Sequence, residues 1–204
     1  MPTKKKILES AAEEFCAKGY RGTTIRDICQ RAMVNVASVN YHFSCKRTLY
    51  KNVVEYLYGE LDHKSINILE IKTEEEWKQE ILSWVQNLLV KITNASLHYK
   101  WINKIFFREM LDASEVFPEF FEKNFNPYFS SIEQLIRLGF PSDTDKKTVY
   151  IAIFSVISQC IFYEQNKIIV SKIFDDKFII DKEEIKRISL FITNSLCSNL
   201  KFSK

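Results

Sequence analysis

The sequence predicts an all-α protein in which a three-helix head precedes a larger helical bundle. Two observations indicate this fold. Only four Gly and four Pro occur in 204 residues, so long stretches lack the residues that most often interrupt helices. Apolar residues also recur at intervals of three or four, as Ile7, Ala11 and Phe15 do near the start of the chain. That spacing places them on one face of a helix.

Glycine and polar residues mark where the helices of the head should end and begin. The first helix is expected over residues 3–18, because Gly19 suits the end of a helix. Three later side chains can accept a hydrogen bond from a free backbone N–H at a helix start: Thr24, Asn35 and Ser44. They predict a second helix after Thr24, a third that ends at about His42, and a fourth that runs on toward the bundle.

The rest of the chain has the pattern of successive helices. Five are predicted, over residues 74–94, 97–112, 117–138, 144–169 and 182–200. Pro118 suits a helix start, whereas Pro127 is expected to kink or split its helix. Residues 170–181, between the last two helices, are predicted to form a loop.

Charge is distributed unevenly along the chain. Residues 1–52 contain ten Lys or Arg and four Asp or Glu, a balance of +6, and residues 53–204 contain nineteen and twenty-two, a balance of −3. The two balances add up to the net charge of +3 of the whole chain. A basic head on a mildly acidic body favours binding of a polyanion by the head, although chance clustering of solvated charge would give the same balance.

Several classes of function find no support in the sequence. The longest apolar stretch, residues 151–163, is shorter than the roughly 20 residues that span a membrane. No apolar signal core follows the first lysines, so a cytoplasmic protein is expected. The five Cys are scattered without a C-x-x-C pair, which indicates reduced thiols. No nucleophile–base pair, phosphate-binding loop or metal cluster appears, so we expect no enzyme, no cofactor and no metal site.

Residues 24–50 carry the most specific pattern in the chain. TIRDICQRAMVNVASVNYHFSCKRTLY predicts two short helices at a tight turn and then an aromatic and basic cluster, which is the arrangement of a helix-turn-helix. The stretch of residues 5–52 resembles the TetR/AcrR-type bacterial transcriptional regulators. The resemblance implies a helix-turn-helix DNA-binding domain over residues 1–52 and a helical effector-binding and dimerisation domain over residues 53–204.

One residue departs from the family pattern. The family usually has Gly in the turn, where this chain has Met33. A left-handed backbone there would disfavour Met by about 1 kcal/mol, so the turn is expected to differ slightly.

Carried over position by position, the resemblance implies two kinds of DNA contact. The residues expected to hold phosphates are Thr24, Tyr41, His42 and Lys46. The residues expected to face base edges or the groove wall are Arg26, Val36, Ala37, Ser38 and Asn40. Arg26 suits a bidentate pair with guanine, and Asn40 suits one with adenine. Tyr41 and His42 have a plainer alternative, which is packing beneath the turn.

The stretch of residues 149–163, VYIAIFSVISQCIFY, is apolar around nearly its whole circumference, so both sides of this helix need cover. One side would face its own bundle, and the other would face a partner. Pairing of this helix and helix 182–200 with their symmetry mates would form a four-helix dimer interface, the usual arrangement in the family. The alternative is a helix buried centrally within one subunit.

The body also resembles one subgroup of the family, more weakly than the head does, in the segments FFREMLDAS at 106–114 and SQCIFY at 158–163. Arg108, Glu109 and Gln159 are polar residues within apolar helices, so their burial requires partners. They either line a ligand pocket or form a structural hydrogen-bond network, and the network is favoured for Arg108 and Glu109. The candidate ligand-binding residues are Trp101, Phe106, Arg108, Glu109, Gln159, Phe162 and Tyr163. Aromatic residues at helical spacing are more often simply core.

The leading hypothesis is a dimeric, ligand-responsive repressor that binds a palindromic operator. Its expected partners are double-stranded DNA, a second copy of itself and an unknown small-molecule effector, with no membrane. Two alternatives remain open. One is a regulator that responds to oxidation of Cys160 or Cys197, and the other is a helical protein-interaction module.

Overall fold

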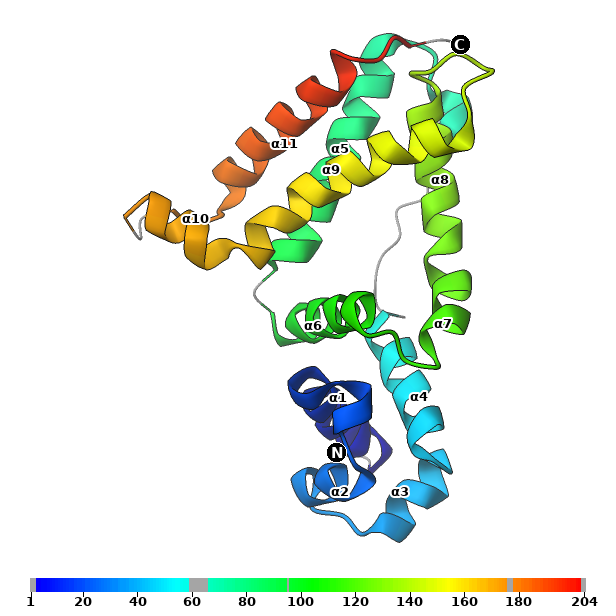
Figure 1. Ribbon diagram of the computed structural model, residues 1–204, viewed down its shortest axis with the longest axis vertical. Helices are drawn as coiled ribbons and strands as arrows, with labels where there is room; N and C mark the ends of the chain where they lie inside the picture. The colour runs from blue at the N-terminus through cyan, green and yellow to red at the C-terminus, as the bar shows by residue number, and fades with distance from the viewer. Residues whose placement is uncertain (1–2, 59–65, 95, 176–177, 203–204) are drawn as a thin grey trace. The chain divides into compact units, whose positions relative to one another are not determined.

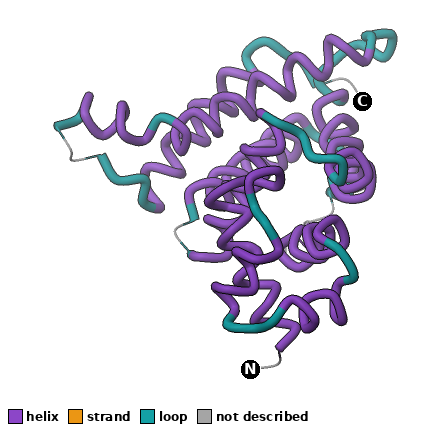
Figure 2. Tube along the Cα trace, turned by 60° about the horizontal axis from the view of Figure 1, so that its bottom comes forward, coloured by secondary structure: helices purple, strands orange, loops and turns teal. Residues whose placement is uncertain are grey.

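The computed structural model describes residues 3–58, 66–94, 96–175 and 178–202. Every regular element in these ranges is a helix, as the sequence predicts, and Figure 2 shows the helices joined by loops. The chain divides into two compact units. Unit 1 contains the described residues up to 58 together with 96–126, and unit 2 contains 66–94 and the described residues from 127 onward.

Unit 1 is built from helices that come from two separate parts of the sequence (Figure 1). They are α1 (Thr3–Gly22), α2 (Ile25–Ala32), α3 (Val36–Phe43), α4 (Lys46–Tyr58), α6 (Leu97–Leu111) and α7 (Phe117–Asn124). Phe15 and Leu49 are fully buried in its core, and Ile102 and Ile105 of α6 belong to the same core. The compact unit therefore extends past residue 52, while a functional boundary at that residue remains a prediction.

Unit 2 is a second helical bundle with its own core. Its elements are the 3₁₀ helix η1 (Ile68–Glu70) and the α-helices α5 (Glu74–Thr93), α8 (Asn126–Arg137), α9 (Lys146–Gln165), α10 (Lys167–Ile173) and α11 (Lys182–Cys197). Helices α5, α9 and α11 pack against one another. The buried Trp77 of α5 donates from its ring nitrogen to the carbonyl of Leu135, 2.9 Å away. A Cβ atom at Gly139 would lie 2.5 Å from the Trp77 ring, so this close approach requires glycine.

Three helix boundaries predicted in the head are confirmed. Gly19 has a φ of 73° and a ψ of 173°, which interrupts α1. The hydroxyl of Thr24 accepts from the backbone N–H of Asp27 at 3.1 Å, and Asn35 Oδ1 accepts from that of Ser38 at 2.8 Å. These side chains satisfy backbone donors that have no partner inside their own helices.

The predicted cap at Ser44 is wrong. Ser44 ends α3 with a φ of 60°, and α4 begins at Lys46. The backbone N–H of Leu49 donates to the carbonyl of Cys45 at 3.0 Å, so Cys45 is the residue that precedes the first turn.

Two predicted helices are each divided in the structure. Phe125 separates α7 from α8, close to Pro127, which was expected to kink or split its helix. Asn166 separates α9 from α10, and its side chain donates to the carbonyl of Phe162 at 3.2 Å. An Asn side chain that bonds to the backbone in this way competes with the hydrogen bonds of the helix, which favours a break here. Residues 170–181 were predicted to form a loop, and this is wrong for residues 170–173, which belong to α10. Asp176 and Lys177 of that segment lie outside the described residues.

Glu14 links α1 to α2 through a buried carboxylate. It is 5% exposed, and it lies 2.8 Å from the Lys18 ammonium and 2.7 Å from the Arg31 guanidinium of α2. The hydrogen bond from Lys18, together with that from Arg31, lowers the pKa of Glu14 although burial acts in the opposite direction. The ionised form of Glu14 is therefore the form that the fold stabilises.

We expect Glu14→Gln to lower the free energy of unfolding at pH 7 by about 1.5–3 kcal/mol, the range for hydrogen bonds to charged groups. Because the folded pKa is lowered, the contribution is complete above the unfolded value of about 4.3 and disappears as the pH falls through the folded value. Urea unfolding at pH 7 and pH 3 measures this difference. Glu9→Gln, at a carboxylate 3.9 Å from Lys5 on the surface, is the control, and an equal loss for Glu14→Gln at both pH values would contradict the assignment.

Candidate nucleic-acid interface

The turn between α2 and α3 is left-handed at Met33. This residue has a φ of 51° and a ψ of 46°, and its N–H donates to the carbonyl of Gln30 at 3.2 Å. The next N–H, of Val34, donates to the carbonyl of Cys29 at 3.0 Å. The backbone at Met33 thus adopts the left-handed conformation that favours Gly. The turn keeps this conformation although a Met side chain makes it less favourable.

Helix α3 presents one side to the core and the other to solvent. Val39 and Phe43 are each 1% exposed and belong to the core of unit 1. The outward side chains are the exposed Val36, Ala37, Asn40 and Tyr41, with Ser38 and His42 half-buried beside them. Tyr41 is 85% exposed, so it does not pack beneath the turn, and its ring centroid lies 5.1 Å from that of His42.

The two candidate residues of the α2 start differ in how strongly they are held. Thr24 donates from its hydroxyl to Asp27 Oδ2 at 2.7 Å, and the Thr24 N–H donates to the same oxygen at 2.9 Å. These bonds lower the pKa of Asp27 to about 2 and fix the first turn of α2. Arg26 is exposed and makes no ion pair with the described residues, so its guanidinium is available to a partner.

Lys46 opens α4, but its ammonium is partly held by the protein. Its Nζ lies 4.6 Å from the centroid of the Tyr20 ring and 3.4 Å from the carbonyl oxygen of Arg21. Burial lowers the pKa of Lys46. With Lys46, all nine residues that the resemblance assigned to DNA lie in unit 1, between the start of α2 and the start of α4.

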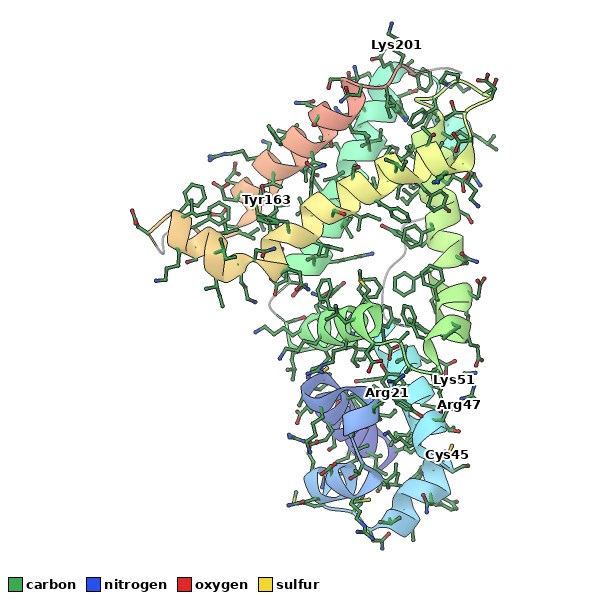
Figure 3. The ribbon with its side chains drawn as sticks, in the orientation of Figure 1. Arg21, Cys45, Arg47, Lys51, Tyr163 and Lys201 are labelled. Atoms are coloured by element: carbon green, nitrogen blue, oxygen red, sulfur yellow. The ribbon has the colours of Figure 1, made fainter. Side chains whose placement is uncertain are left out.

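Further basic side chains of unit 1 are paired with carboxylates. Figure 3 labels Arg21, Arg47 and Lys51, which lie on one side of this unit. Arg21 is 3.2 Å from Asp112, Arg47 is 3.9 Å from Glu115, and Lys51 pairs with Glu119. Sequence reasoning did not predict these pairs, because the acidic partners follow α6, about 60 to 90 residues further along the chain.

Arg108 and Glu109 of α6 have protein partners in unit 1. Arg108 donates from Nε to the carbonyl of Cys16 at 3.0 Å and from Nη2 to that of Ala17 at 2.6 Å, at the point where Gly19 interrupts α1. The buried Glu109 accepts from the Tyr50 hydroxyl and from the N–H of Ser114. These bonds have the form of the structural network that the sequence favoured for this pair.

The seven candidate ligand-binding residues divide between the two units. Trp101 and Phe106 are half-buried against the core of unit 1, and a cavity of about 150 Å³ in that unit is lined in part by Arg108 and Glu109. The other three candidates lie on α9 in unit 2: Gln159, Phe162 and Tyr163. Their roles toward a ligand remain predictions.

The three candidates on α9 have modest burial and local partners. Gln159 donates to the carbonyl of Ser155 at 3.1 Å in its own helix, and Phe162 is 50% exposed. The ring of Tyr163, labelled in Figure 3, stacks on Phe178 with centroids 6.5 Å apart.

The thiols named in the redox alternative are buried. Burial raises the pKa of Cys160 to about 12 and that of Cys197 to about 11, so both are protonated at neutral pH and shielded from oxidants. Cys45 is the exposed thiol of the chain. No group of metal-ligating residues is found among the described residues, and none of their helices is long and apolar enough to cross a membrane.

Comparison with known families accounts for most of the chain. The family described as "Bacterial regulatory proteins, tetR family" matches residues 7–53, and the C-terminal domain of the HTH-type transcriptional dual regulator CecR matches residues 78–200. The chain belongs to the TetR family. TetR-family proteins of this kind are helix-turn-helix transcription regulators, so the chain is not an enzyme.

Two curated TetR-family relatives match part of the chain. The probable HTH-type transcriptional regulator YttP of Bacillus subtilis is 38% identical over 92 residues, which are 42% of this chain and 44% of the relative. The negative transcriptional regulator IcaR of the biofilm operon icaADBC, from Staphylococcus aureus, is 37% identical over 60 residues, 29% of this chain and 32% of the relative. The chain thus spans less than half the length of either relative.

Solved structures share the TetR-family fold along nearly the whole chain. AibR, solved with isovaleryl coenzyme A and operator DNA, has a TM-score of 0.64 at 15% identity and covers 95% of this chain and 97% of its own. HlyIIR, a hemolysin II transcriptional regulator, has a TM-score of 0.59 at 22% identity and covers 94% and 97%. At these identities the likeness shows the fold alone.

We expect Met33→Gly to raise the stability of the protein by about 1 kcal/mol, because Gly removes the Cβ strain of a left-handed residue. For a chain of this length the melting temperature should rise by about 2–4 °C. Differential scanning calorimetry measures this change. Met33→Ala retains the Cβ atom and serves as the control, and a gain of the same size for Ala would show that strain is not the cause.

Proposed function

We propose that this TetR-family chain is a homodimeric, sequence-specific DNA-binding repressor that a small-molecule effector releases from a palindromic operator. The observation that carries the proposal is the solvent-facing side of α3. Its outward residues have no role in the core, and they stand on a helix whose opposite side is anchored by Val39 and Phe43. A helix held in this way can enter a major groove without losing its packing.

The DNA contacts proposed for this surface fall into two chemical kinds. Tyr41, His42 and Lys46 present a hydroxyl, an imidazole and an ammonium that suit phosphate oxygens. Asn40 and Arg26 present exposed amide and guanidinium groups that suit the edges of adenine and guanine. Thr24 would contact a phosphate beside its cap, and Val36, Ala37 and Ser38 would lie against the groove wall.

Dimerisation is supported by the outward faces of α9 and α11. The inward face of α9 is buried, with Val149, Ile153 and Val156 each at most 1% exposed. On the opposite faces of these two helices, large apolar side chains remain exposed: Ile151 at 59%, Phe154 at 52%, Phe162 at 50%, Leu190 at 38% and Phe191 at 71%. Such a surface on adjoining helices is typical of a protein interface, and a second copy would cover it with an identical face.

Repression and effector release are proposed from the relatives. IcaR is a negative regulator, and AibR binds both operator DNA and isovaleryl coenzyme A. In this chain, Arg108 and Glu109 join α6 to the carbonyl end of α1 and to Tyr50 of α4. A ligand that binds better when α6 is displaced would therefore also displace the head, so ligand and DNA would each weaken the binding of the other. Residues 1–52 would read DNA, and residues 53–204 would bind the effector and dimerise.

Selection of bound fragments from random DNA should enrich a palindromic motif. Asn40→Ala should weaken binding of that motif by about 1–3 kcal/mol for each base that Asn40 reads, and it should relax one position in each half-site. Tyr41→Phe should weaken all sequences alike, because a phosphate contact carries no base information. Absence of any enriched motif at moderate salt would falsify the proposal, and a changed motif with Tyr41→Phe would contradict its assignment to phosphate.

Sedimentation should give twice the chain mass of 24.1 kDa. Phe154→Glu combined with Phe191→Glu should yield monomers, because a charge buried at an apolar interface is strongly unfavourable. Leu69→Glu, at a residue of unit 2 that is 83% exposed, is the control and should leave the dimer intact. Monomeric wild-type protein at micromolar concentration would rule out this interface.

A further inference from the structure

The start of α1 carries a charge pattern that works against its own helix. Lys4, Lys5 and Lys6 are consecutive, and the first turn of α1 contains no acidic residue. Positive charge at the amino end of a helix opposes the helix dipole and is unfavourable there. The charge of these lysines is therefore unfavourable toward the dipole of α1, and a role outside this helix would account for it.

These lysines lie next to the end of α3. The Lys4 ammonium is 6.0 Å from the centroid of the Phe43 ring, and Phe43 is the last residue of α3. The Phe43 ring lies 6.1 Å from His42, which in turn lies 5.1 Å from Tyr41. The start of α1 is thus close to Phe43, the residue that follows His42 at the end of α3.

The lysines are also poorly neutralised compared with several other basic residues near α3 and α4. Arg21, Arg47 and Lys51 each have a carboxylate partner. Lys5 has only Glu9, at 3.9 Å, and Lys4 and Lys6 form no ion pair with any described residue. Arg26 and Lys46 also form no ion pair with a described residue, so the lysines at the start of α1 add to the positive charge near α3 that no carboxylate neutralises.

We propose that Lys4, Lys5 and Lys6 bind the sugar–phosphate backbone of the operator next to the groove that α3 enters. The inference rests on the proposed function. It extends the proposed DNA-binding surface from α2, α3 and Lys46 to the start of α1. DNA is the occupant that the charge favours, because it is a polyanion already placed against Tyr41 and His42 by the proposed docking of α3. The contacts would add affinity and no base specificity.

Helix α6 offers a matched control. Lys100 and Lys104 are exposed residues of unit 1, and they precede Arg108, which contacts the carbonyls of Cys16 and Ala17. Cys16 lies twelve residues after Lys4 in α1, so the two residues are about 18 Å apart along the helix axis at a rise of about 1.5 Å per residue. Substitution of Lys100 and Lys104 removes the same charge from a different helix of unit 1.

The experiment measures binding of the selected operator by the full chain as a function of salt concentration. Lys4→Gln combined with Lys6→Gln should make the slope of log affinity against log salt shallower by about 0.9 for each phosphate that these lysines neutralise. Affinity at about 0.1 M salt should fall about tenfold, and the enriched motif should not change. Lys100→Gln combined with Lys104→Gln should leave the slope nearly unchanged.

Equal effects of the two double variants would overturn the inference, because they would reflect net charge alone. An unchanged salt slope for Lys4→Gln with Lys6→Gln would also overturn it, whatever the change in melting temperature, because Lys4 has a contact with the Phe43 ring inside the fold. If the wild-type chain selects an operator and the α1 variants bind it normally, only this inference fails. If the wild-type chain selects no operator, the proposed function fails with it.

Discussion

Burial of Val39 and Phe43 is the constraint on which the proposed DNA-reading surface depends. Helix α3 has only eight residues, too few to be stable alone in water, so its position comes from these two anchors and from its Asn35 cap. Once both side chains are in the core, the helical repeat directs Asn40 and Tyr41 outward. Burial therefore determines both the stability of this helix and the side chains that it offers to a partner.

Helix α6 contributes to the same unit from a distant part of the sequence. Its apolar residues Ile102 and Ile105 complete the core, while Arg108 binds free carbonyls at the end of α1 and Glu109 binds Tyr50. A carboxylate as buried as Glu109 is costly without such partners. The helices that carry the proposed DNA contacts are thus held by a helix of the proposed effector domain, which gives a physical route between the two functions.

Local sequence was a good guide wherever a few neighbouring residues decide the structure. Thr24 and Asn35 cap their helices because their acceptors lie within three residues of the donors they satisfy. The same reasoning failed at Ser44, where a φ of 60° at the end of α3 moved the helix start to Lys46. It failed again at residues 170–173, which were expected to form a loop but belong to α10, where Val170 is buried.

The all-helical fold, the helix-turn-helix and the outward residues of α3 could be predicted from the sequence, because they follow from helical periodicity and from short-range capping. The partners of Arg108 and Glu109 and the neutralisation of Arg21, Arg47 and Lys51 could not, because they are set by the packing of the folded chain. Such outcomes depend on contacts between residues far apart in the sequence, as between Tyr50 and Glu109, 59 positions apart. Helical periodicity gives the direction of a side chain from its own helix, but not the group that it meets.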